Sequence, residues 1–156
     1  KQTVRTDTYS VTCNAHTTAS SDAIQVQITP TRSDSKVLIL ISIHGSSQYM
    51  GSVCCGSWQG FLMKNGSILV QGDASGSRQR MTMRTGDSDS NQVEEPLNFN
   101  YLDSPATTSA VTYGVRLHNS DNGSKVMYLN RSAGDADSVT TTTRTVSTII
   151  AMEVSG

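Results

Sequence analysis

The chain has only three cysteines, and their positions exclude a disulfide framework. Cys13 stands alone, and Cys54 and Cys55 are neighbours, whose direct bridging would strain the peptide between them. The odd number indicates free thiols and no dependence on an oxidising compartment. A zinc site formed by Cys13, His16 and the adjacent pair would match no common spacing of zinc ligands. We therefore predict neither a metal nor a cofactor.

Charge and long apolar runs are also scarce. Charged residues make up 16% of the chain, the formal net charge is −1, and the 12 Lys and Arg form no basic run. This argues against electrostatic binding to nucleic acid. The longest apolar stretch, Val37 to Ile41, is far shorter than the ~20 residues needed to span a bilayer, so we predict no membrane insertion.

Small polar residues fill the chain instead. There are 23 Ser and 19 Thr among 156 residues, and 35% of residues are hydrophobic. Disorder usually combines low hydrophobicity with high net charge, which this chain does not have. Thr, Val and Ile suit a pleated, half-buried surface. Since the length is near the common domain size of about 100–150 residues, we expect residues 1–156 to form a single β-rich domain.

Short segments of alternating polarity, separated by turn signals, predict about eight to ten antiparallel strands and no helix. This spacing favours an all-β fold, a single β-sandwich or jelly roll. The strands are expected at residues 9–13, 23–29, 36–44, 57–64, 67–71, 79–84, 96–101, 111–118, 125–130 and 143–154.

Two of these segments carry further information. Asn65-Gly66 lies between two strand-like runs and allows the positive φ angles that a tight type I′ hairpin turn needs. The segment from Val37 to Ile41 is apolar at every position, which is typical of a strand covered on both faces. We expect the second cover to be another subunit.

Sequence signals for catalysis are weak. No nucleophile elbow and no glycine-rich phosphate loop occur. Glu94 and Glu95 are adjacent, so on a strand their side chains face opposite ways and make a poor acid–base pair. His16, His44 and His118 have no orienting partner visible in the sequence. We predict that the chain is not an enzyme.

The run Asp87-Ser-Asp89-Ser-Asn91 imitates the start of a calcium-binding loop. The match then fails, because Gln92 stands where glycine is needed and Asn98 stands where glutamate is needed. A calcium site of another geometry and a solvated surface loop both stay open.

Trp58, the single tryptophan, has two interpretations. The first is packing in the core. The second is a ring that stacks on a ligand together with Tyr49, since aromatic faces beside amide and carboxylate groups suit the C–H face and hydroxyls of a sugar.

Several phrases, in this order along the chain, resemble a domain found at the C-terminal end of structural proteins of tailed phages, especially marine phages and cyanophages. Such proteins are usually tail fibres or receptor-binding proteins. The phrases are KVLILISI (36–43), GDASGSR (72–78), NYLDSPATTSA (100–110), YLNRS (128–132) and STIIAMEV (147–154).

The resemblance implies a virion protein, a homotrimer of β-sandwiches, and the C-terminal part of a longer fibre protein. It also suggests that Asp73 and Asp103 lie in turns and pair with Arg78 and Arg131. Recognition would then belong to the loops at 46–56, 85–95, 119–123 and 134–138, because loops on a rigid scaffold often carry binding function.

The leading hypothesis is a non-enzymatic receptor-binding domain of a phage tail fibre that recognises a bacterial surface polysaccharide or outer-membrane protein. The alternative is a decoration or structural protein of the capsid or tail that binds only other virion proteins. A glycan-degrading enzyme would need a carboxylate pair that the sequence does not supply. The candidate binding residues are Gln48, Tyr49, Trp58, Asp87, Asp89 and Asn91.

Overall fold

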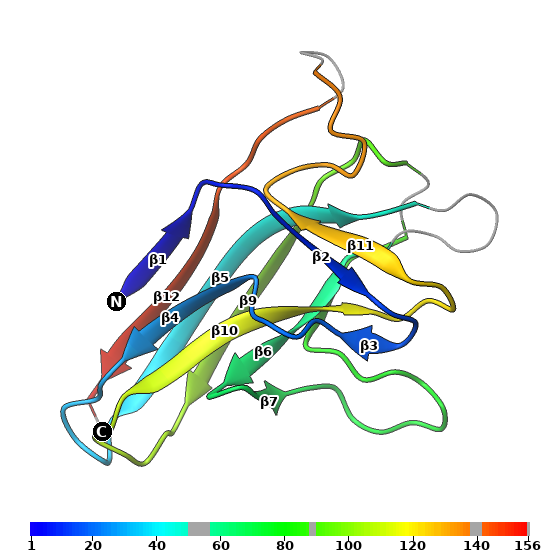
Figure 1. The fold of residues 1–156 in the computed structure, drawn as a ribbon. Coiled ribbons are helices and arrows are strands. Elements are labelled where there is room, and N and C mark those ends of the chain that lie inside the picture. The colour runs from blue at the N-terminus through cyan, green and yellow to red at the C-terminus, as the bar shows by residue number, and fades with distance from the viewer. Residues whose placement is uncertain (50–56, 88–89, 138–141, 156) are drawn as a thin grey trace.

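The computed structural model describes residues 1–49, 57–87, 90–137 and 142–155. In these residues the chain is all β, with no helix, and its strands form two antiparallel sheets (Figure 1). The strands of the first sheet are β1 (Gln2–Arg5), β2 (Tyr9–Cys13), β5 (Lys36–Ser47), β9 (Glu95–Asp103), β11 (Lys125–Leu129) and β12 (Ser147–Val154). The strands of the second are β3 (Thr17–Thr18), β4 (Ile24–Ile28), β6 (Gln59–Lys64), β7 (Ser67–Val70), β8 (Met83–Arg84) and β10 (Val111–Asn119).

The long strand β5 organises the first sheet. Along its first part it lies between β12 and β9, and β1 pairs with the free side of β12. The β12 ladder ends where Thr148 faces Ser42, and β11 takes over where Leu129 faces Gly45. Strand β2 then pairs with β11. The strand expected at 36–44 is therefore longer, and the loop expected at 46–56 begins later, because Gly45–Ser47 still belong to β5.

The pairing of the strands is nested along the chain. Strand β1 pairs with β12, β4 with β10, β5 with β9, and β6 with β7. The innermost pair, β6 and β7, is the expected hairpin: Lys64 faces Ser67, and the φ angles of Asn65 and Gly66 are 49° and 83°. Both turn residues therefore take the left-handed conformation that asparagine and glycine tolerate best.

The core lies between the two sheets. Alternate residues of β4 are buried, which confirms the alternating pattern read from the sequence. From Val37 to His44, β5 alternates between buried and half-buried positions, although its sequence begins apolar on both faces. Ile39 and Ile149 from the first sheet and Tyr113 and Leu117 from the second are fully buried in one cluster. Strand β10 is buried or half-buried at every position because β4 and β6 flank it and the first sheet covers its inner face.

The strand expected at 79–84 is shorter in the structure, where only Met83–Arg84 (β8) pairs with β6. Before β8, the side chain of Thr82 makes the hydrogen bonds to β6 and β7 that a strand would make with its main chain. Its Oγ1 accepts a 3.1 Å hydrogen bond from the Leu62 amide and donates to the Val70 carbonyl, beside the register shift between Leu62 and Met63. Strands β1 and β3 were not expected, and β12 begins at Ser147 rather than at 143.

Candidate functional site

Three of the four expected recognition loops meet at one end of the sheets, at residues 48–49, 90–94 and 130–137, which we call the loop end. Asn91 joins them. Its Oδ1 accepts a 2.7 Å hydrogen bond from the Tyr49 amide, and its Nδ2 donates to the Tyr49 carbonyl at 3.4 Å. Its own carbonyl accepts a 2.6 Å bond from the amide of Gly134. Segments far apart in sequence are thus fixed to one another by a single side chain and its backbone.

Several charged side chains at or beside the loop end have partners within the chain. Arg131 Nη1 lies 2.7 Å from Asp135 Oδ2, and Arg144 forms a second ion pair with the same carboxylate. Glu94 accepts hydrogen bonds from Thr143 Oγ1 at 2.8 Å and from Thr145 Oγ1 at 2.6 Å. These bonds order the loops but use up the groups that a charged ligand would need.

Trp58 is completely buried, so its expected role as a ligand-stacking ring is wrong and the core-packing interpretation is confirmed. Its indole lies against Gly45, where a Cβ would come within 2.5 Å of the ring atom Cζ2. Its main chain is paired with Thr85, whose amide donates to the Trp58 carbonyl at 2.9 Å. Trp58, which directly precedes β6, thus packs the start of β6 against β5.

Gln48 and Asp87 have polar partners other than Tyr49 and Asn91. Gln48 extends the β5–β11 ladder: its amide donates to the Val126 carbonyl at 2.9 Å. Asp87 is exposed and pairs with Arg84 at 2.8 Å. Asp89 lies outside the described residues, as do residues 50–56 with Cys54 and Cys55.

The expected pairs between the turn aspartates and Arg78 or Arg131 are also wrong for Asp103. Asp103 is buried and lies 2.6 Å from Lys64 Nζ, and it accepts the hydroxyl of Tyr113. Arg131 pairs with Asp135 instead, and Arg78 donates to Ser75 Oγ at 3.1 Å.

A polar cleft that the sequence did not reveal lies at the start of β6. We call it the Gln59 cleft. It has a volume of about 510 Å³, which is in the usual range of small-molecule pockets. It is lined by Gln59, Arg78, Gln79, Met81, Arg84, Ser120 and Asp121. Gln59 lies on β6 and Arg84 on β8, while the other residues come from the segments that follow β7 and β10.

Hydrogen bonds fix the walls of this cleft. Gln59 Nε2 donates to Ser120 Oγ at 2.5 Å, and Gln79 Nε2 lies 2.8 Å from His16 Nδ1. The buried side chain of Asn119 holds the turn after β10, since its Oδ1 accepts the amide of Asp121 at 3.0 Å and its Nδ2 donates to the Gly123 carbonyl at 2.7 Å. The fourth expected loop, 119–123, therefore belongs to the cleft and not to the loop end.

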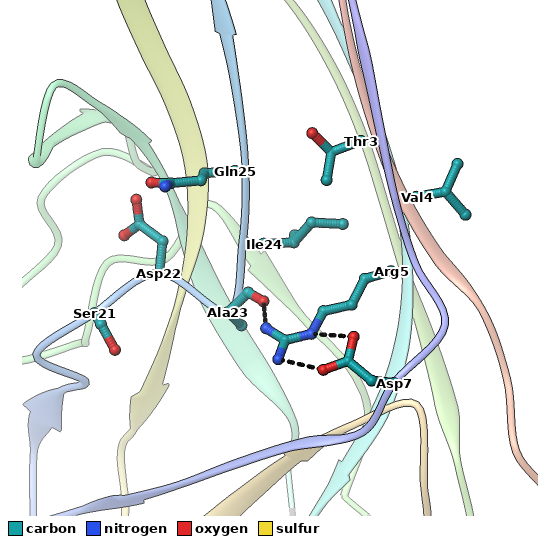
Figure 2. Close-up of a pocket in the computed structure, with 9 residues that line it drawn as sticks. All are labelled: Thr3, Val4, Arg5, Asp7, Ser21, Asp22, Ala23, Ile24 and Gln25. Atoms are coloured by element: carbon teal, nitrogen blue, oxygen red, sulfur yellow. Dashed lines mark hydrogen bonds and ion pairs between the residues drawn. The ribbon is translucent and has the colours of Figure 1, made fainter.

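A second pocket, of about 440 Å³, opens between β1 and β4 at the edge of the two sheets (Figure 2). Figure 2 shows Arg5 bonded to Asp7 and to the Ala23 carbonyl. Asp22, at the same pocket, accepts a 2.8 Å bond from Arg116 Nε. Since its charged groups have partners within the chain, this pocket has a structural role in joining β1 to β4.

Isolated titratable groups in the core are shifted toward their neutral forms. Burial, together with the charge of His16, lowers the pKa of His118, and burial raises the pKa of the Cys13 thiol. Within the described parts of the chain, no group of three His, Cys, Asp or Glu side chains is placed to hold a metal ion. The same residues contain no helix long and apolar enough to cross a membrane.

No protein-family model matches the sequence, and no curated protein matches it significantly. The function must therefore be inferred from the geometry described above.

Proposed function

We propose that the chain is the receptor-binding domain of a phage tail fibre, part of the virion, and that it binds a bacterial surface polysaccharide or outer-membrane protein without catalysis. The observation that carries this proposal is the gathering of loops from distant parts of the chain, tied by Asn91, at one end of an all-β scaffold. Loops held by a rigid scaffold commonly bind other molecules.

The scaffold we infer is a β-sandwich of the jelly-roll type. The nested pairing of β1 with β12, β4 with β10, β5 with β9 and β6 with β7 supports it, because a jelly roll is one long hairpin rolled into two sheets. The shared core cluster between the sheets supports it as well.

We infer further that three copies assemble through the apolar face, which is the outer face of β1, β12, β5 and β9. In the ladder, Leu38 faces Met152 on one side and Leu102 on the other. Leu102 and Met152 are 47% and 41% exposed. The apolar residues of this face are Val4, Leu38, Leu40, Leu102, Ile150, Met152 and Val154. The apolar face includes the outer face of β5, the strand that the sequence predicted to be covered on both sides.

The apolar face suits a second copy of the same chain. Around a threefold axis the same face of each copy meets its neighbours, so like charges near the axis would repel. Within these four strands, the outward positions carry no acidic residue, one lysine, Lys36, at the end of β5, and one histidine, His44. Trimerisation would also give three receptor sites in one particle, and avidity would strengthen weak single sites.

The test is binding to cells. Purified, fluorescently labelled protein is incubated with a panel of candidate host bacteria, cyanobacteria among them, with and without excess unlabelled protein. The proposal expects saturable binding, competed by unlabelled protein, to a subset of strains. Absence of competed binding to every strain that the parent virion infects would refute it.

One observation favours the alternative, a decoration or structural protein that binds other virion proteins. Several charged side chains at or beside the loop end have partners within the chain, as Arg131 has in Asp135. Antibody against the domain separates the two functions: label at the fibre tip supports receptor binding, and label on the capsid or collar supports decoration.

A further inference from the structure

A buried side chain supports one wall of the Gln59 cleft. Gln59 is 1% exposed, and its Oε1 is closed off from solvent, so a ligand does not reach this oxygen. The amide instead fixes Ser120, whose Oγ accepts a bond from Gln59 Nε2. The hydroxyl hydrogen of Ser120, which lines the cleft, is left to donate to a ligand.

The cleft also holds one uncompensated positive charge. Asp121 is neutralised by its ion pair with the buried Lys125, and Arg84 by Asp87. Arg78 is exposed and, over the described parts of the chain, has no carboxylate partner; it donates only to Ser75. A guanidinium in this state is suited to bind one carboxylate through two parallel hydrogen bonds.

The remaining walls suit a sugar ring. Met81 is half-buried and gives the cleft an apolar side for C–H groups. The amide of Gln79 and the hydroxyl of Ser120 offer both donors and acceptors for sugar hydroxyls.

We propose that the Gln59 cleft binds a saccharide that carries a carboxylate, with the carboxylate on Arg78 and ring hydroxyls on Gln79 and Ser120. This inference rests on the proposed function, since it names the acidic glycan that the domain would recognise on a cell surface. It adds a second receptor contact, beside β6 and β8, to the one at the loop end.

The experiment is a titration of the whole chain, followed by amide NMR, with glucuronic acid and with glucose as the neutral match. Glucuronic acid is expected to shift the resonances of Gln59, Gln79 and Ser120 in a saturable way, and glucose to shift them at least about tenfold more weakly, because a hydrogen bond to a charged group is lost. Equal affinity for the two sugars would overturn the proposal.

Variants localise the site. Arg78→Met is expected to weaken glucuronic acid binding about tenfold or more, and Arg78→Lys by less, because lysine keeps the charge but not the two-pronged geometry. Arg80→Met is the matched control: Arg80 is also exposed, but it donates to the Gly72 carbonyl and does not line the cleft. Equal loss in Arg78→Met and Arg80→Met would refute the assignment.

Cell binding by the same variants distinguishes this inference from the proposed function. Wild-type protein that binds cells but shows no saturable shift with glucuronic acid would overturn the cleft assignment and leave the receptor function standing. Wild-type protein that binds no cells would overturn the receptor function. Loss of cell binding in Arg78→Met alone supports both.

Discussion

The hydroxyl of Tyr113 donates a 2.7 Å hydrogen bond to Oδ2 of Asp103 inside the core. Tyr113 belongs to β10 of the second sheet, and Asp103 ends β9 of the first. Lys64, from β6, lies 2.6 Å from the same carboxylate oxygen. One buried carboxylate therefore joins strands of both sheets, at the end of the molecule opposite the loop end (Figure 1).

Replacing Tyr113 with phenylalanine should lower the free energy of unfolding by about 1–3 kcal/mol, because Asp103 would lose a buried donor. Urea denaturation measures the change. Tyr101→Phe is the matched control: Tyr101 is half-buried and stacks on Phe99, and no hydrogen bond to its hydroxyl is seen among the described residues, so we expect a change within about 0.5 kcal/mol. Equal effects of the two substitutions would show that the Tyr113–Asp103 bond adds nothing.

Acid should destabilise the fold through His118. The ring is buried, lies 3.0 Å from Thr18 Oγ1 and meets Phe61 edge-on. Burial lowers the pKa of His118 below the ordinary value of about 6.5. As the pH falls below that value, His118 therefore becomes protonated in the unfolded chain but stays neutral in the folded chain. The stability that His118 contributes is therefore present above about pH 6.5 and is lost below it.

The melting temperature at about pH 7.5 and at about pH 5.5 tests this sign. The drop between the two should be smaller in His118→Gln than in the wild type, because the variant lacks the proton-uptake site. His16→Gln should reduce the drop only in part, because it removes the nearby charge but leaves the His118 ring buried. An identical drop in wild type and His118→Gln would contradict the assignment.

Removing the Asn91 side chain should release the loop end. Asn91→Ala loses both side-chain bonds to the Tyr49 backbone, so we expect faster hydrogen exchange at the Tyr49 amide and weaker binding to cells. Gln25→Ala, which removes an exposed amide side chain on β4 of the other sheet, is the control. Unchanged exchange at Tyr49 in Asn91→Ala would mean that the loops hold their positions without it.

A charge on the apolar face should separate the subunits. Met152→Lys is expected to give a folded monomer, since three copies would bring three ammonium groups together. Ile68→Lys is the matched control, because Ile68 is 43% exposed, close to the 41% of Met152, and lies on β7 of the other sheet. If Met152→Lys keeps the mass of the wild type, or if both variants dissociate, the apolar face is not the interface.

The sequence predicted most strands because their burial alternates residue by residue. The alternation of Ile24, Val26 and Ile28 marks β4, and Asn65-Gly66 marks the hairpin. The short and polar β1 carries no such pattern. In the same way, no pattern reveals that Thr82 would take the place of the main chain beside β6.

The candidate site was harder to predict because it depends on contacts between distant residues. A single tryptophan suits a core or a binding site equally well, and the packing of Trp58 on Gly45 decides for the core. Gln59 meets Ser120 across 61 positions of sequence, so nothing local marks its amide as the floor of a cleft. Tyr49 and Asn91 lie in loops, and nothing local in the sequence indicates the hydrogen bonds between them. Their role in binding stays a prediction.

The most direct test of the account is to measure mass and cell binding on one sample, by sedimentation equilibrium and then by saturation binding of the labelled protein. The account predicts a mass near three times 16.7 kDa, competed binding to a subset of bacterial strains, and weaker binding by the Met152→Lys monomer. A mass near 16.7 kDa together with no competed binding to any strain would contradict it.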